Sequence, residues 1–435
     1  MIRLFLHRLF SDPAVWALPV AGFALTSSIG LMVFGGATYF FTVEDPSLRS
    51  IYTVYAAVAL ILLVVPMLAL MSSAARLLAR RRDERLGSLR LLGTSAGQLR
   101  RLVLAESALL AVTGITLGTV LYSVLMPLAG LLPFAGAQMG AAGLWLGPGL
   151  LAGAVSVLLI FAVVAAYAGL RRVEVTPLGV RTRQSPQGVK WIRAAVAAGG
   201  VVVVYVLYTM VPVQGEFWVM LVAFVFLAVP LLAVQLIGPW VLKLMTRRQL
   251  RRAKTAQQLI AARNVLESPQ QMWRQVGGVA VAAFIGVIAG CGVGLISMGE
   301  FQEGSVDAMV FGDLSRGVWL TLGVAFLLTA CSVGLNQTAH ILDRRDLYAG
   351  LAKLGVGLGQ LNRIRRLSVM RSLVAVLAVA VVAACVVAFP VVGAAILTAP
   401  ASVLTIAAVL TAGVGMIWVG TLTTAPTMRA VALAA

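Results

Sequence analysis

The chain has 435 residues, of which 60% are hydrophobic and only 11% are charged, and its mean hydropathy is +0.99. This balance excludes a water-soluble enzyme, because too few polar side chains are present to cover a soluble globule. It also excludes a soluble nucleic-acid-binding protein despite the net charge of +19, since the Lys and Arg residues lie in short gaps between apolar runs. We therefore expect an all-α integral membrane protein.

Apolar runs long enough to cross a bilayer, about 20 residues each, predict ten membrane spans. In chain order they are 14–41, 51–77, two within the uncharged stretch 107–170, 194–211, 217–245, 276–297, 318–340, and two within the uncharged stretch 372–428. Gly and Pro residues between Pro127 and Pro148 predict the turn in the first uncharged stretch, and Pro400 predicts the turn in the second. Residues 1–12 predict a short amphipathic helix on the membrane surface.

The distribution of basic residues predicts the orientation. With both termini in the cytoplasm, all Lys and Arg lie on the cytoplasmic side except Arg49 and Arg316, as the positive-inside rule requires. Arg outnumbers Lys by 30 to 4, which is typical of a GC-rich bacterial genome, so we expect the bacterial cytoplasmic membrane. The opposite side then holds an acidic loop, whose carboxylates we interpret as solvated; the alternative is that they attract a cationic or amphipathic substrate. These residues are Glu300, Glu303, Asp307 and Asp313.

The most charged connector, between the second and third spans, occurs twice. Residues 82–101 match residues 344–363 without a gap, and eight of the twenty positions are identical, which indicates an internal duplication. The candidate residues of the first copy are Arg82, Asp83, Glu84, Arg85, Leu86, Leu89, Leu92 and Gly93. Those of the second copy are Arg344, Arg345, Asp346, Leu351, Leu354 and Gly355.

Each connector predicts a short amphipathic helix, a sharp turn and a long membrane helix. In the first copy three leucines recur on one face, Gly93 ends the helix, and Ser95 with Gln98 forms a capping box for the next helix. Gly357 and Gln360 occupy the matching places of the second copy. Loops that only maintain topology need charged residues but not the same residue spacing in both copies. We therefore predict that the connectors are docking elements, which transmit the movement of a soluble partner to the membrane helices.

Glu106 lies near the start of the third span, at the position that Ser368 occupies in the second copy. Ionisable groups at membrane depth are costly and usually paired, and Arg101 or Arg371 is a candidate partner. An ion pair that holds the connector is one interpretation, and a proton or substrate role is the other. The spans also carry recurrent glycines, which predict close helix packing and also suit a sliding interface: Gly114, Gly118, Gly286, Gly290 and Gly294.

The connector pattern R-R-D-E-R-x-x-x-L-R-x-L-G-T-S, followed by a span that opens with Glu106 and contains Gly114 and Gly118, resembles the FtsX-like, MacB-type permease family of ABC transporters. The ten-span layout is most similar to the Bce-type permeases, except that residues 298–317 stand where those proteins carry a large extracellular domain. The resemblance implies that 83–92 and 345–354 are coupling helices, received by a cytosolic ABC ATPase expected as a homodimer.

The domain division that follows is a four-span repeat at 1–170, basic linkers with a two-span hairpin at 171–258, and a second four-span repeat at 259–435. The chain lacks the G-x-x-x-x-G-K-[ST] phosphate loop, so we expect no cofactor or catalysis here, with ATP and Mg on the partner. No metal-ligand spacing and no nucleophile with a neighbouring base is found either.

The function expected from these observations is that of an ABC permease subunit, which exports or extracts an amphipathic antibiotic, peptide or lipid as its ATPase turns over. Membrane lipids are expected partners, and nucleic acid is not. The alternative is a regulatory scaffold that controls a cell-wall hydrolase or a sensor kinase. A secondary transporter is the third hypothesis, and it predicts ionisable residues at the bilayer midplane, which only Glu106 approaches.

Overall fold

The computed structural model describes residues 13–80, 96–170, 199–200, 216–299, 305–343, 350, 353 and 357–422. Within these ranges, nine helices are long and apolar enough to cross a membrane, which confirms a multi-pass, all-α membrane protein. The expected span at 194–211 lies almost entirely outside the described residues, as does the helix expected at 1–12. The total of ten spans therefore stays a prediction.

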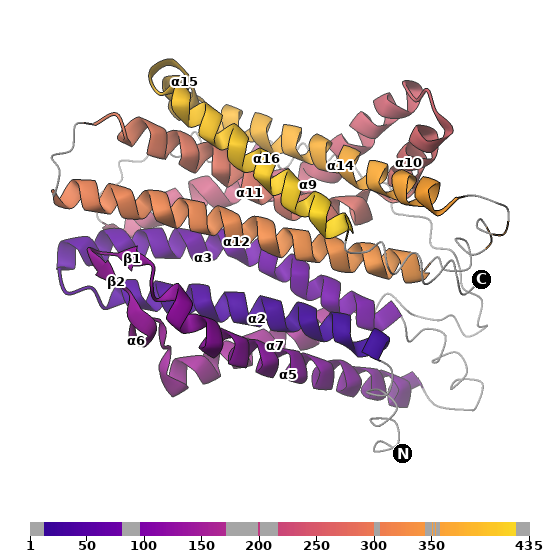
Figure 1. Ribbon diagram of the computed structural model, residues 1–435, viewed down its shortest axis with the longest axis horizontal. Helices are drawn as coiled ribbons and strands as arrows, with labels where there is room; N and C mark the ends of the chain where they lie inside the picture. Colours follow the sequence, from indigo (N-terminus) through magenta and orange to yellow (C-terminus); the bar gives the residue numbers. More distant parts are fainter. Residues whose placement is uncertain are drawn as a thin grey trace.

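The first half of the chain forms α2 (Pro13–Phe41), α3 (Pro46–Arg80), α5 (Ala96–Ala129), the short α6 (Gly140–Leu144) and α7 (Gly147–Leu170). The second half forms α9 (Glu216–Arg251), α10 (Ala256–Glu267), α11 (Pro269–Ile296), α12 (Val306–Asp343), α14 (Leu358–Val387), α15 (Phe389–Thr398) and α16 (Pro400–Leu422). The long helices run side by side along the longest axis of the molecule (Figure 1).

Two helix groups meet at the centre of the bundle. In the first group, α2 packs against α3 and α5, and α7 covers α3 and α5. In the second, α11 packs against α12, α14 and α16, and α9 with α10 covers α14. The contact between α3 and α12 joins the groups (Figure 1), and α11 forms the core, with every residue from Val276 to Val287 buried.

Glycines allow the closest helix contacts, as the sequence predicts. A side chain at Gly114 or Gly118 would overlap α2, and at Gly118 the obstacles are the Ser27 hydroxyl and the backbone of Ala24. A side chain at Gly290 or Gly294 would overlap α16 in the same way. Gly286 has only an ordinary contact distance to Leu322, so its role in close packing is smaller. Small residues bring helix backbones together where apolar burial gives no driving force, as in a bilayer.

A small β-hairpin interrupts the otherwise helical fold between α5 and α7. Strands β1 (Pro133–Phe134) and β2 (Ala137–Gln138) pair antiparallel, with Pro133 opposite Gln138. Ala135 and Gly136 form the two-residue turn with φ of 53° and 78°, the left-handed pair that tight hairpins require. Gly adopts this conformation freely, but Ala does not, so Ala135 is held there by its surroundings.

Two boundaries differ from the sequence prediction. Helix α12 begins at Val306, whereas the span was predicted from residue 318, so Asp307 and Asp313 belong to a helix rather than to a loop. The second fold-back is made by the separate helix α15, which follows α14 after a single residue, rather than by a turn at Pro400 alone. In the first case apolar and small residues extend the helix through a stretch where the local charge had predicted a loop.

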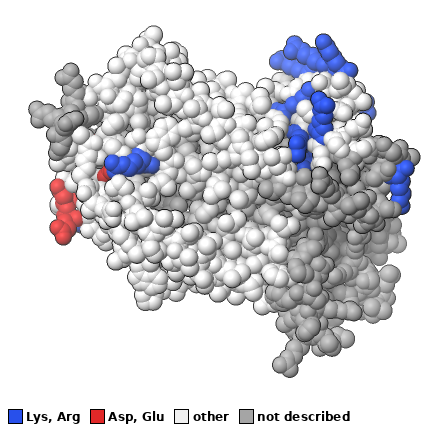
Figure 2. All heavy atoms as spheres, in the orientation of Figure 1, with Lys and Arg blue, Asp and Glu red and all other residues white. Residues whose placement is uncertain are grey.

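Charge is separated along the bundle. The Lys and Arg side chains of the described residues gather mainly at one end, and the visible Asp and Glu side chains lie at the other (Figure 2). At the acidic end, Asp45 accepts hydrogen bonds from the Ser47 hydroxyl and backbone N–H, directly before α3. These bonds hold the pKa of Asp45 below its ordinary value. The separation fits the predicted orientation, which stays a prediction.

Candidate functional site at the interface between the two helix groups

Helices α3 and α12 run parallel and touch along most of their length. Their polar contacts join Tyr52 to Asp313 at the acidic end and Ser73 to Ser332 nearer the basic end, so residue numbers rise in the same direction on both helices. Between Tyr52 and Ser73, α3 rises by about 31 Å, close to the thickness of a hydrocarbon core. The interface is therefore polar near both membrane surfaces and apolar between them, where Leu63, Leu70 and Leu328 are fully buried.

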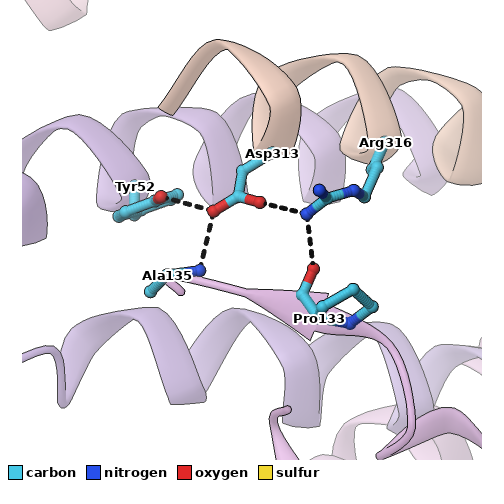
Figure 3. A network of polar contacts seen from close by, with 5 residues as sticks. All are labelled: Tyr52, Pro133, Ala135, Asp313 and Arg316. Carbon is cyan, nitrogen blue, oxygen red and sulfur yellow. Dashed lines mark hydrogen bonds and ion pairs between the residues drawn. The ribbon is translucent and has the colours of Figure 1, made fainter. Parts of the chain in front are cut away.

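Asp313 is the centre of the network at the acidic end (Figure 3). Its side chain is 1% exposed, and its Oδ2 atom accepts from the Tyr52 hydroxyl at 2.6 Å and from the Ala135 backbone N–H at 2.7 Å. Its Oδ1 atom pairs with Arg316, which also donates to the Pro133 carbonyl at 2.9 Å. One carboxylate thus joins α12 to α3 and to the hairpin.

The hairpin, which belongs to the first helix group, contributes aromatic contacts and a backbone hydrogen bond to this network. Phe40 stacks on the Tyr52 ring with centroids 5.2 Å apart and meets Phe134 edge to face at 5.5 Å. The bond from the Ala135 N–H to Asp313 compensates for the left-handed conformation of that residue. The hairpin tip is consequently positioned by a residue 178 positions away in the sequence.

The prediction of Asp313 as a solvated loop carboxylate is wrong. The residue is 2% exposed, because α12 starts early enough to turn this side chain toward α3. A buried carboxylate is tolerated only when it is paired and hydrogen-bonded, and these contacts supply both. Asp307 is exposed, as expected, while Glu300 and Glu303 lie outside the described residues.

A second polar cluster joins the same two helices nearer the basic end. The hydroxyls of Ser73 and Ser332 lie 3.0 Å apart, and the Asn336 amide donates to Ser73 at 2.8 Å and to the Ser332 carbonyl at 2.9 Å. Gln337 donates to Gln275 on α11 at 2.8 Å. Sequence reasoning missed this cluster, although an Asn and a Gln inside an apolar span are a signal, since such groups are costly in lipid unless they have partners.

A cleft of about 370 Å³ lies beside this interface, between α3, α7, α9 and α11. Its walls are mainly apolar, with Leu68, Phe161 and Val164 among them, and Arg274 lies on its rim. Gln235 also lines the cleft, but it is engaged by α11, accepting from the Trp273 indole at 2.8 Å and donating to the Gly277 carbonyl at 3.3 Å. The cleft therefore offers a mainly apolar surface.

The structure tests the predicted connectors only at their downstream ends. All the candidate connector residues named above, in both copies, lie outside the described residues. The helices that follow them begin at Ala96 and Leu358 and continue unbroken into the membrane, as expected, and Gly357 is the N-terminal cap of α14. Within the described residues, no group of three or more His, Cys, Asp or Glu side chains is placed to hold a metal ion.

Glu106 is 7% exposed and has an interaction partner, so it is a buried, engaged carboxylate. Its pairing with Arg101 or Arg371 stays a prediction. The matching Ser368 is also buried, and its hydroxyl lies 3.3 Å from the Ala261 carbonyl of α10. The duplicated position is therefore buried in both copies but carries different chemistry.

Comparison with known proteins identifies no relative: no family model and no curated protein matches the chain. The family resemblance consequently rests on the sequence pattern of the connectors and the spans that follow them.

Proposed function

We propose that the chain is the membrane permease subunit of an ABC transporter of the FtsX-like, MacB-type class. A separate cytosolic ATPase, bound at the two connectors, holds ATP and Mg and drives the cycle. The chain converts the movement of the ATPase into export or extraction of an amphipathic antibiotic, peptide or lipid. It is a bacterial cytoplasmic membrane protein with both termini in the cytoplasm.

The observation that carries this proposal is the series of helix contacts that leads from the helix after each connector to the central interface. Helix α5 follows the first connector as one rigid rod and packs on α2 through Gly114 and Gly118. Helix α14 follows the second connector and packs on α11. Since α2 contacts α3 and α11 contacts α12, a push on either connector reaches the α3–α12 interface through close helix contacts.

Support for an internal duplication comes from the pairing of helices. The contacts of α2 with α5 and α3 correspond to those of α11 with α14 and α12, and the contact of α3 with α7 corresponds to that of α12 with α16. The parallel α3 and α12 hold equivalent places in the two units. Parallel repeats of this kind suit transport by movement of one unit against the other.

The cleft between α3, α7, α9 and α11 is the place we assign to the substrate. It opens between the two helix groups, so a change at the α3–α12 contact alters its width. Its apolar walls suit an acyl or other hydrophobic moiety. Recognition then takes place within the membrane, between spans.

Co-expression with candidate ABC ATPases tests the proposal. We expect stable co-purification, and ATP hydrolysis in lipid nanodiscs that responds to an amphipathic substrate. Leu89→Asp or Gly93→Asp should abolish this coupling, because each introduces a charge into the apolar face or the turn of the first connector. ATPase association that survives disruption of both connectors would contradict the docking role. Substrate movement driven by an ion gradient without nucleotide would contradict the ABC mechanism.

A further inference from the structure

A cavity of about 500 Å³ lies against the first turns of α14, at the basic end of the bundle. The described residues that line it form one stripe along that helix at spacings of three and four. They are Gly359, Asn362, Arg363, Arg366, Leu367 and Met370. The proposed function uses none of them.

The stripe changes character along the helix. Its first part carries the polar and basic side chains of Asn362, Arg363 and Arg366, and its second part carries the apolar Leu367 and Met370. Because α14 enters the membrane in this direction, the basic part faces the surface and the apolar part faces the hydrocarbon region. That order matches a molecule with an anionic head and a hydrophobic chain.

Two polar atoms of the stripe are buried without a hydrogen-bond partner. They are the Arg366 Nε and the Asn362 Oδ1. An unpaired buried N–H in an ionised guanidinium is costly, so it marks a place where an acceptor from outside the chain would stabilise the protein. A phosphate oxygen is the acceptor that a guanidinium binds best, and α14 itself carries no carboxylate that could take this place.

The duplication supplies an internal comparison. In the first copy, Arg100 and Arg101 correspond to Asn362 and Arg363, while Leu104 holds the position that corresponds to Arg366. Both copies therefore carry two arginines on this stripe, but only the second copy places one of them a turn further along the helix, at Arg366. Charge that merely oriented the protein in the membrane would not require an arginine to lie partly buried one turn further into the helix.

We propose that this stripe of α14 binds the phosphate of an anionic phospholipid from the leaflet at the basic end, with one acyl chain along Leu367 and Met370. Arg363 and Arg366 hold the phosphate, and the absence of a side chain at Gly359 leaves room for the headgroup, since a Cβ there would meet nothing within 4 Å. The site is independent of the substrate cleft and of the ATPase.

Titration of the purified full-length chain with phosphatidylglycerol, phosphatidylcholine and inorganic phosphate, followed by native mass spectrometry, tests the proposal. We expect one tightly held phosphatidylglycerol and a much weaker response to phosphatidylcholine. Arg366→Gln should lower the phosphatidylglycerol affinity by about tenfold or more, the size expected for a hydrogen bond to a charged group. Arg366→Lys should restore part of it, because it keeps the charge.

The matched control is Arg248→Gln, which removes one charge from an exposed residue of α9 outside the cavity and should leave the affinity unchanged. An equal loss in the control would reduce the effect to overall charge and overturn the site. Equal binding of the two phospholipids would overturn the anionic preference. Inorganic phosphate that displaces the lipid fully and binds as tightly would instead identify a free-phosphate site. Unchanged thermal unfolding of Arg366→Gln without lipid verifies that the variant is folded.

Discussion

Replacing Asp313 by Asn tests the network that joins the two helix groups. The carboxylate accepts from Tyr52 and from the Ala135 N–H on one oxygen and from Arg316 on the other. Asn has a single acceptor oxygen, so whichever way its amide turns, its NH₂ group opposes at least one of these donors. The variant keeps the size of the side chain and removes only the charge and one acceptor.

The expected loss follows from the partners. Hydrogen bonds to a charged group contribute about 1.5–3 kcal/mol each, and a buried donor left opposite another donor adds a desolvation penalty, so we expect about 2–4 kcal/mol in total. The contact with Arg316 contributes less than about 1 kcal/mol of this, because that side chain is 49% exposed and solvent screens the pair. Tyr52→Phe removes one hydrogen bond to the carboxylate and should cost about 1.5–3 kcal/mol, at the lower end because the Ala135 N–H still occupies the same oxygen.

The measurement is the free energy of unfolding in detergent or nanodiscs, for which Asp307→Asn is the control because that residue is exposed on the same helix. The expected order of destabilisation is Asp313→Asn, then Tyr52→Phe, then Arg316→Gln, with Asp307→Asn near zero. A control variant as destabilised as Asp313→Asn would refute the argument. So would a larger effect at Arg316 than at Tyr52, since that would place the energy in the exposed ion pair.

Three further predictions concern packing and movement. Gly118→Ala should destabilise the protein by about 1–3 kcal/mol or more, because its Cβ overlaps α2, whereas Gly153→Ala on the open face of α7 should be neutral in the same thermal unfolding assay. In a background without native cysteines, the double variant Ser73→Cys with Ser332→Cys should form a disulfide on oxidation, which gel mobility detects. The disulfide should stop substrate-stimulated ATP hydrolysis reversibly. Hydrolysis that the crosslink does not affect would contradict movement at this interface. Ala165→Trp should fill the substrate cleft and lower substrate stimulation several-fold without loss of ATPase binding, and unchanged stimulation would exclude the cleft as the substrate site.

Much of the architecture could be predicted because the bilayer restricts the solutions available to a chain. Long apolar runs must become helices in lipid, so the uncharged stretches predicted the spans that became α5, α7, α14 and α16. Glycines such as Gly118 and Gly290 predicted close helix contacts for a related reason. Helices in a bilayer associate through close packing rather than through the hydrophobic effect, and a residue without a side chain lets two helix backbones approach.

The sequence by itself determined the class of the protein, most of its spans and the duplicated connectors, because these depend on composition and on local periodicity. Only the tertiary structure decided which polar residues meet. Asp313 looks like a loop carboxylate until α12 is seen to start at Val306 and turn it toward Tyr52, and nothing local to Ala135 predicts its bond to a side chain 178 residues away. The physical reason is that burial and pairing depend on contacts between helices far apart in the chain, and those contacts carry no periodicity within either helix.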